Sequence, residues 1–307
     1  MNWGELITLE YGKPVKDKEA TDGKVPVYGT NGQIGTSHLP AQCKHPSFIL
    51  GRKGAYRGVH YSDCPFSVID TAFYAEPLTD RIDLKWAYYK FLTYDINGMD
   101  SGSAIPSTDR YQIYSIEVEV PPLEKQRKIV AVLDCIDRKI NINQKVNDNL
   151  EQQAQAIFKE WFIENPENNE WSTGTFSELI KTTLNGDWGK EAPIGNNAEK
   201  VYCIRGADIP EVKAGNKGKM PTRYILPKNF VTKQLTAGDI VVEISGGSPT
   251  QSTGRCTAIT QSLLDRYDSG MVCTNFCKAI KPKEGYSLFI YYYWQYLYSK
   301  GIFFSYD

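Results

Sequence analysis

The sequence predicts an α+β protein in which two β-rich, mixed α/β domains are separated by one long helix of the coiled-coil type. Three observations lead to this prediction. The chain of 307 residues exceeds the usual size of a single hydrophobic core. Short apolar runs bounded by glycine, proline and asparagine fill residues 1–118 and 166–307. An unbroken helical pattern occupies residues 119–165 between them.

The first segment is expected to be compact and mostly β. Runs such as KVPVYGTNGQIG and PSFILGRKGAYRGVHYS combine β-branched and aromatic residues with turn residues, which is typical of short strands. The later stretch LKWAYYKFLTYDI spaces its apolar residues by three and four, and this spacing predicts a helix.

The stretch PPLEKQRKIVAVLDCIDRKI, residues 121–140, marks the start of the long helix. Its proline pair suits a first turn, where no backbone N–H is needed, and Glu124 complements the positive end of the helix dipole. The helix is expected to end near Asn165, because a proline follows. About 40 residues at 1.5 Å each would make a rod of roughly 60 Å.

Apolar residues recur along this helix at spacings of three and four and form one continuous seam. A helix of that length cannot bury such a seam alone, so it needs a partner helix. Asn143 and Asn147 interrupt the seam, as polar residues do when they fix the register of a coiled coil. The residues predicted to pack against the partner helix are Ile129, Leu133, Ile136, Ile140, Leu150, Ile157 and Trp161.

The pattern of the first domain returns, loosely, in residues 166–307. WSTGTFSELIKTTLNGDWGK echoes NWGELITLEYGKPVK, DIVVEISGGSPTQSTGRC echoes PSFILGRKGAYRGVHYS, and MVCTNFCKAIKP echoes VIDTAFYAEP, all in one order. Thr71 precedes the aromatic run at Trp86 by about as many residues as Thr274 precedes the run at Phe289. The sequence therefore predicts a domain, a rod and a second, related domain.

Charge is unevenly distributed along the chain. The net charge of -1 argues against a generally basic nucleic-acid binder. Two stretches, 23–62 and 212–238, nevertheless contain several lysines and arginines and no acidic residue. Local positive fields of this kind favour contact with a polyanion, although solvated surface loops would give the same composition.

The start PPLEKQRKIVAVLDCIDRKIN, followed by LEQQAQAIFKEWF, resembles the central conserved region of the specificity subunit of type I restriction-modification systems. VPVYGTNGQIG, ILGRKGAYRGVHY, IDTAFY and GSAIP resemble a target recognition domain of the same family. The resemblance covers residues 4–299 and implies two target recognition domains, 1–118 and 166–307, around a conserved helix. A second conserved helix, which in the family packs antiparallel against the first, is absent from this sequence, so the last domain is expected to be incomplete.

For such a subunit the resemblance implies a non-catalytic role in the recognition of a split DNA site, one half-site for each domain, with the helix setting the gap. Methyltransferase (M) subunits are expected to bind the chain, and restriction (R) subunits to join through the complex. The unpaired helix would allow self-association. No cofactor is expected in this chain, with S-adenosylmethionine, ATP and Mg bound by partner subunits. The alternative is a coiled-coil adaptor without sequence-specific DNA binding.

Three loops hold the candidate DNA contacts. Glycines let a backbone approach a phosphate, and arginine can form paired hydrogen bonds with a phosphate or a guanine edge, although an ordinary β-turn would have the same composition. In the first domain the candidates are Thr30, Asn31, Gly32, Gly51, Arg52, Lys53, Gly54, Tyr56 and Arg57. In the second domain, where hydroxyl and amide groups replace basic ones and a flexible surface loop is the alternative, they are Ser245, Gly246, Gly247, Ser248, Thr250, Gln251 and Arg255.

The sequence predicts neither a catalytic site nor a metal site. No methyltransferase or P-loop motif occurs, so no catalytic residue is predicted. The spacing of the histidines and neighbouring cysteines matches no common zinc finger, so no metal site is predicted.

No apolar run approaches the roughly 20 residues of a membrane span and no secretory signal is evident, so a cytoplasmic protein is expected. Residues expected to hold the core together are Asp70, Thr71, Phe73, Thr274, Asn275 and Phe276.

Overall fold

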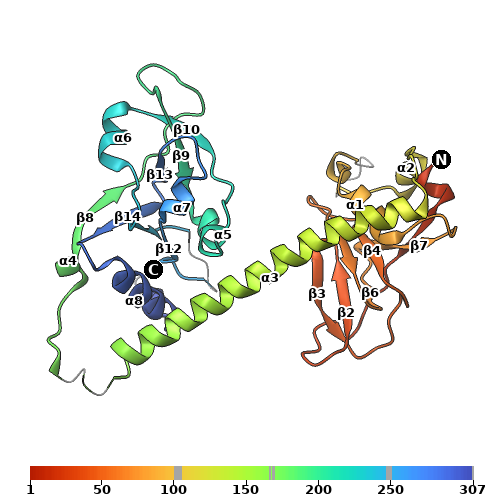
Figure 1. Cartoon of the computed structure of the whole chain (residues 1–307), viewed down its shortest axis with the longest axis horizontal. Helices are drawn as coiled ribbons and strands as arrows, with labels where there is room; N and C mark the ends of the chain where they lie inside the picture. The colour runs from red at the N-terminus through yellow and green to blue at the C-terminus, as the bar shows by residue number, and fades with distance from the viewer. Residues whose placement is uncertain (100–105, 166, 168–169, 247–250, 306–307) are drawn as a thin grey trace. The chain divides into compact units, whose positions relative to one another are not determined.

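The computed structural model describes residues 1–99, 106–165, 167, 170–246 and 251–305 (Figure 1). The chain forms two compact units, Met1–Lys139 and Ile140–Asp307, and the boundary between them falls within helix α3 (Leu123–Phe162). Each unit is therefore described by itself. The three-part division at residues 118 and 165 stays a prediction.

Unit 1 contains two sheets. The first is antiparallel, with strands in the order β1 (Ile7–Tyr11), β7 (Ala72–Pro77), β4 (Ser47–Gly51) and β5 (Val59–Ser62). The second has the order β3 (Gly32–Ser37), β2 (Val25–Gly29) and β6 (Ser67–Val68). In this smaller sheet β2 runs parallel to β6 and antiparallel to β3.

The main core of unit 1 lies between the larger sheet and helix α1 (Leu84–Phe91), which packs on β4 and β5. Phe91 is buried, and its ring centroid lies 4.6 Å from that of Trp3 and 4.8 Å from that of Phe48. Helix α2 (Arg110–Ser115) closes the core with Ile113. The apolar residues that predicted strands and a helix here are the ones that fill this core.

Unit 2 repeats this topology. Its larger sheet has the order β8 (Ile180–Asn185), β14 (Cys277–Pro282), β11 (Ile240–Glu243) and β12 (Cys256–Ala258). Its smaller sheet has the order β10 (Thr222–Ile225), β9 (Glu199–Ile204) and β13 (Met271–Cys273), and β9 and β13 are parallel. The internal repeat that the sequence predicts is therefore confirmed in the strand order of both sheets.

Helices surround the sheets of unit 2. Helix α8 (Ser287–Ser299) packs on β12 and β14 and corresponds in chain order to α1. The four shorter helices are α4 (Phe176–Leu179), α5 (Ile209–Lys213), α6 (Pro227–Lys233) and α7 (Gln261–Leu264). No helix in the described ranges is both long enough and apolar enough to cross a bilayer.

Helix α3 is 40 residues long, as the sequence predicts. Gln126 fixes its first turn to unit 1: the side chain is buried, its Nε2 donates to the carbonyls of Arg81 (2.8 Å) and Pro121 (2.7 Å), and its Oε1 accepts from the amide of Asp83 (2.9 Å). Further along, Asp134 lies 2.6 Å from the ammonium of Lys85 on α1, and this contact lowers the pKa of Asp134. Contacts of the buried Gln126 and of Asp134 thus fix the start of α3 within unit 1.

Candidate nucleic-acid interface

Three loops of unit 1 meet beside the ends of β2, β4 and β7. The Thr30 hydroxyl lies within hydrogen-bond distance of the carbonyl oxygens of Lys53 (2.9 Å) and Thr71 (2.6 Å). The amides of Arg52 and Lys53 both donate to the Thr71 carbonyl, at 2.8 and 3.1 Å. We call residues 30–32, 52–57 and 70–71 the unit 1 loop cluster. The structure therefore brings together two of the loops that the sequence singled out.

The glycines of this cluster have backbone reasons of their own. Gly54 has φ +115° and Gly32 has φ +116°, a region that favours glycine. Gly51 is buried at the end of β4, where a Cβ would lie 2.8 Å from the Cα of Arg57. These positions shape the turn whether or not a phosphate approaches it.

The cationic part of the cluster is built around Tyr11. The guanidinium of Arg52 lies 4.8 Å from the centroid of the Tyr11 ring, and its Nη1 donates to the Asp70 carbonyl at 3.0 Å. Arg110 of α2 lies over the same ring at 4.9 Å. Lys53 is 41% exposed and its ammonium is 3.7 Å from the Asp70 carboxylate, so the pair is weak. Two arginines and a lysine thus share a small surface.

Two other candidates present polar groups at this surface. Tyr56 is 63% exposed and Asn31 is also exposed. Within the described ranges neither side chain forms a hydrogen bond to the protein, so each is available for an outside partner. An asparagine amide can pair with an adenine edge, and a tyrosine ring can stack on a base.

Arg57 corrects the sequence prediction. Its side chain is 2% exposed, and Nη2 donates to the carbonyls of Ile96 (3.2 Å) and Asn97 (2.8 Å). Because the guanidinium is buried and bound to backbone carbonyls, it cannot contact DNA in this conformation. It holds the loop cluster on the 3-10 turn at Ile96–Gly98.

The register of strand pairing identifies which residues of unit 2 are equivalent to the loop cluster of unit 1. Gly51 pairs with Ala72 in unit 1, and Glu243 pairs with Cys277 in unit 2. Continuing from these pairs puts Ile244 at the position of Arg52, Ser245 at Lys53, Gly246 at Gly54 and Phe276 at Thr71. The backbone agrees, since the Ile244 amide donates to the Phe276 carbonyl at 2.9 Å and Gly246 has φ +109°.

Different chemistry occupies this equivalent surface. Ile244 is 51% exposed and Phe276 is 64% exposed, where unit 1 has an arginine and a threonine. The prediction that Phe276 belongs to the core is therefore wrong. Ser245 and Gly246 are exposed and Gln251 is half-buried, whereas Gly247, Ser248 and Thr250 lie outside the described residues.

Arg255 is a second correction. Its Nε and Nη2 each lie 2.8 Å from a carboxylate oxygen of Glu243, whose side chain is 6% exposed. This paired contact joins β12 to β11 and uses the donors that a phosphate would need. Arg255 is therefore a structural residue of unit 2 and not an available DNA contact.

This ion pair leads to a stability prediction. Arg255→Met should lower the free energy of unfolding by about 3 kcal/mol, because the Glu243 carboxylate stays buried without its partner. The double variant Glu243→Gln with Arg255→Met should recover much of that loss. Urea denaturation measures both, with Arg266→Met, an exposed arginine, as the control. Equal losses in the single and double variants would contradict this role.

The second acid-free stretch is less cationic than its composition suggests. Acidic residues from other segments pair with three of its basic groups, at 4.0, 2.9 and 3.3 Å. These pairs are Lys213 with Glu151, Arg223 with Glu191, and Lys233 with Asp187. The positive field that the sequence predicts for unit 2 is thus partly neutralised.

The α3 seam is largely exposed within the described chain. Leu150 is 57% and Trp161 60% exposed, and Ile136, Ile140 and Ile157 are exposed as well. Leu133 is half-buried. Ile129 corrects the prediction, because it packs against the main core of unit 1 instead of facing outward. The exposed seam, which we define as Ile136, Ile140, Leu150, Ile157 and Trp161, remains suited to a partner helix.

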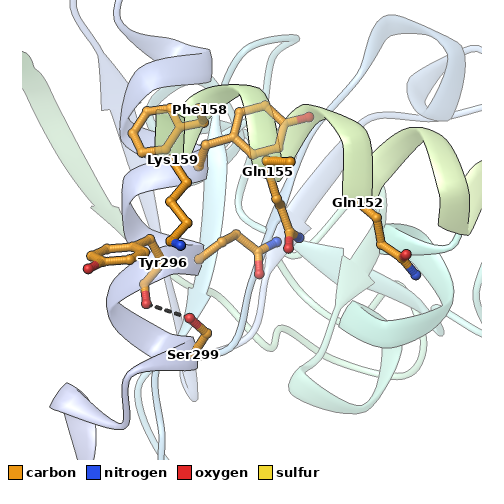
Figure 2. Close-up of a pocket in the computed structure, with 9 residues that line it drawn as sticks. Gln152, Gln155, Phe158, Lys159, Tyr296 and Ser299 are labelled. Atoms are coloured by element: carbon orange, nitrogen blue, oxygen red, sulfur yellow. Dashed lines mark hydrogen bonds between the residues drawn. The ribbon is translucent and has the colours of Figure 1, made fainter. Parts of the chain in front are cut away.

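A second apolar stripe of α3, offset by one residue from the seam, packs on α8. Phe158 is 6% exposed, and its ring centroid lies 5.6 Å from that of Phe289. Beside this contact is a groove of about 270 Å³, to which α3 contributes Gln152, Gln155 and Lys159. Figure 2 shows Lys159 pointing toward α8, near Tyr296. Amides, one amine and the Ser299 hydroxyl line this groove together with aromatic rings. The hydroxyl donates to the Tyr296 carbonyl at 2.7 Å, so it is not paired with a base as a nucleophile would be.

Comparison with known proteins identifies the family. Residues 2–152, which cover nearly all of unit 1 and about the first eight turns of α3, match the type I restriction modification DNA specificity domain. The chain belongs to the specificity-subunit family of type I restriction-modification systems. Specificity subunits are non-catalytic and typically carry no cofactor.

Two curated members of this family are similar to parts of the chain. The HindI specificity subunit of Haemophilus influenzae is 32% identical over 77 residues, which are 25% of this chain and 16% of that subunit. The MjaIX specificity subunit of Methanocaldococcus jannaschii is 29% identical over 155 residues, 49% of this chain and 32% of that subunit. The matches thus span a third or less of each relative.

A solved specificity subunit has the same fold. The crystal structure of the type I S subunit from M. genitalium aligns with a TM-score of 0.58 and 15% identity, covering 98% of this chain and 77% of that one. This likeness supports two β-rich domains separated by a long helix. It says nothing about which residues bind DNA.

Sequence reasoning misses three residues of the candidate interface. Arg110 lies outside both acid-free stretches, beside Asp109, so charge alone does not single it out. Ile244 and Phe276 resemble ordinary strand residues. Only the ladder register, which makes them equivalent to loop-cluster positions of unit 1, brings them to attention.

Proposed function

We propose that this chain recognises a bipartite DNA site, with unit 1 on one half-site and unit 2 on the other. The observation that carries the proposal is that two units of one topology present different side chains at equivalent loop positions. Repeated topology favours a repeated mode of binding. Different side chains favour different half-site sequences, because base edges are distinguished by the donors and acceptors that meet them.

In unit 1 we assign DNA contact to the exposed part of the loop cluster. Arg52 and Lys53 supply positive charge, with Arg110 beside them, and Asn31 and Tyr56 supply groups that can distinguish bases. In unit 2 the corresponding surface contains Ser245, Gly246 and Gln251 with the exposed Ile244 and Phe276. Apolar groups of this kind contact thymine methyls or stack on bases.

Helix α3 sets the gap between half-sites in this proposal. A continuous helix changes length only with residue count, at 1.5 Å per residue, whereas a flexible linker would blur the spacing. Half-sites on one face of DNA recur about every 34 Å, which a helix of roughly 60 Å can span. The exposed seam would pair with a second helix, supplied by another copy of the chain or by sequence beyond it.

The chain would act in the cytoplasm as the DNA-recognition subunit of a larger complex. M subunits would bind it and supply S-adenosylmethionine, and R subunits joining the complex would supply ATP and Mg chemistry. Membership of the family supports this division.

Competition binding tests the proposal against the adaptor alternative. A labelled duplex carrying the bipartite site, selected from a random library by the chain with its M subunits, is displaced by unlabelled DNA. We expect the selected site to compete at least about 10³-fold better than a random duplex, with affinity falling steeply as salt rises. If random DNA competes equally well, the chain is an adaptor and the proposal is wrong.

A further inference from the structure

Unit 1 contains a cluster of metal-ligand side chains far along its strands from the loop cluster. Cys43, His45 and Glu76 each offer one ligand atom, and these atoms all lie within 4.8 Å of one another. Cys43 and His45 precede β4, whereas Glu76 is the next-to-last residue of β7. The loop cluster lies at the other ends of these two strands. The cluster is therefore separate from the proposed DNA interface.

The spacing of the ligand atoms suits a small tetrahedral ion. The Cys43 Sγ lies 3.9 Å from Nε2 of His45 and 3.8 Å from Oε1 of Glu76. Zinc bonds of about 2.3 Å to sulfur and about 2.1 Å to nitrogen or oxygen separate tetrahedral ligand atoms by about 3.4 to 3.6 Å. Both observed separations come within a few tenths of an ångström of this range, whereas Nε2 of His45 and Oε2 of Glu76, 2.6 Å apart, would have to move apart by about 0.8 Å to admit the ion. His45 and Glu76 are 38% and 33% exposed, so they can adjust.

The hydrogen bonds of His45 leave a place for a cation. Its Nδ1 lies 3.0 Å from the Pro46 carbonyl and therefore carries a proton. In the neutral ring Nε2 then presents a lone pair, yet it lies 2.6 Å from a carboxylate oxygen of Glu76. The Nε2 lone pair and the carboxylate oxygen are both acceptors, so at 2.6 Å they need a proton or a metal ion between them. A proton would satisfy these two. The buried Cys43 thiol donates to the His45 carbonyl at 3.3 Å, and after loss of the thiol proton a metal ion could bind the sulfur together with the other two ligand atoms.

Unit 2 shows a cation at the equivalent place. Glu76 lies four residues beyond Ala72, and Lys281 lies four beyond Cys277, the position that corresponds to Ala72 by register. The Lys281 ammonium is 2.6 Å from the carboxylate of Asp239, directly before β11. The Lys281 ammonium thus links β14 to the residue directly before β11. In unit 1 the same link consists of a thiol, an imidazole and a carboxylate, with no lysine or arginine among the three.

We propose that Cys43, His45 and Glu76 bind a zinc ion, with water as the fourth ligand, which fastens the entry of β4 to β7. A thiolate and an imidazole select zinc over magnesium or calcium. Binding converts the Cys43 thiol to a thiolate and releases its proton to solvent. The exposed sides of His45 and Glu76 leave the fourth position open to water. The ion braces unit 1 as the Lys281–Asp239 pair braces unit 2.

Metal titration of the purified full-length chain tests this site. After dialysis against a chelator, the chain should bind one equivalent of Zn²⁺, measured by elemental analysis and by competition with a chromophoric chelator. Its melting temperature should rise. Co²⁺ in the same site should give a sulfur-to-metal charge-transfer band that Cys43→Ser removes.

Two further variants test the site independently in case Cys43→Ser fails to fold. His45→Gln and Glu76→Gln change half-exposed side chains, and each should weaken zinc binding at least about tenfold, because a lost ligand matters more than a lost outer partner. Cys64→Ser and His38→Gln should bind zinc as the parent does. Absence of stoichiometric zinc, or binding unchanged in both glutamine variants, would overturn the proposal and leave only a protonated His45–Glu76 pair.

Discussion

Inserting seven residues between Lys139 and Ile140 should lengthen the preferred gap between half-sites by about three base pairs. Seven helical residues add about 10.5 Å and turn the helix by nearly two full turns, so the seam stays almost in phase. The insertion point lies between the α3 residues Asp137, which accepts a hydrogen bond from Tyr89, and Asn147, which donates to the Ala214 carbonyl. Packing within each unit is therefore preserved.

Sequencing of methylated DNA from cells that carry this variant with its M subunits measures the result. The partner helix must receive the same insertion. Both half-sites should be unchanged, although overall methylation will fall because three base pairs also rotate the duplex by about 100°. Seven residues inserted beside Gly195, a turn glycine of unit 2 with open space around it, should leave the gap unchanged. Altered half-sites with the original gap would show that the roles are assigned the wrong way round.

Arg52→Ala should weaken specific DNA binding by about 10- to 100-fold, equivalent to about 1 to 3 kcal/mol, and only through one half-site. Tyr11 positions the guanidinium, and Arg52→Lys should not restore specificity, because an ammonium cannot form the paired contact with guanine. Binding to duplexes mutated base by base in each half-site measures the effect.

Arg81→Ala is the matched control, since Arg81 is an exposed arginine of unit 1 outside the loop cluster. It should change binding by less than about twofold. A loss for Arg52→Ala that is equal for specific and random duplexes would make Arg52 a phosphate contact, because phosphate contacts position a protein without distinguishing sequence.

Features determined locally were predictable from the sequence. The start of α3 depends on a proline pair and Glu124, and its length on an uninterrupted pattern, so both are confirmed. The repeat was also predictable, because three echoes in one order correspond to equivalent strands. The candidate loops were found because turn residues and charge mark them directly.

Contacts between distant segments were not predictable. Arg57 looks like its neighbours in sequence, but the carbonyls that bury it come from Ile96 and Asn97, some 40 residues away. Phe276 aligns with Phe73 by sequence, whereas the ladder places it at the position of Thr71, two residues earlier and just before β14 begins, where its side chain is exposed. The ligand Glu76 was missed because no spacing rule connects it to Cys43.

The most direct test of a two-unit recognition subunit is the set of sites methylated when the unaltered chain is expressed with its M subunits. We predict one motif with two specified elements separated by a gap of fixed length, and Arg52→Ala should relax only one element. A single uninterrupted motif, a gap of variable length, or methylation without sequence preference would contradict the account.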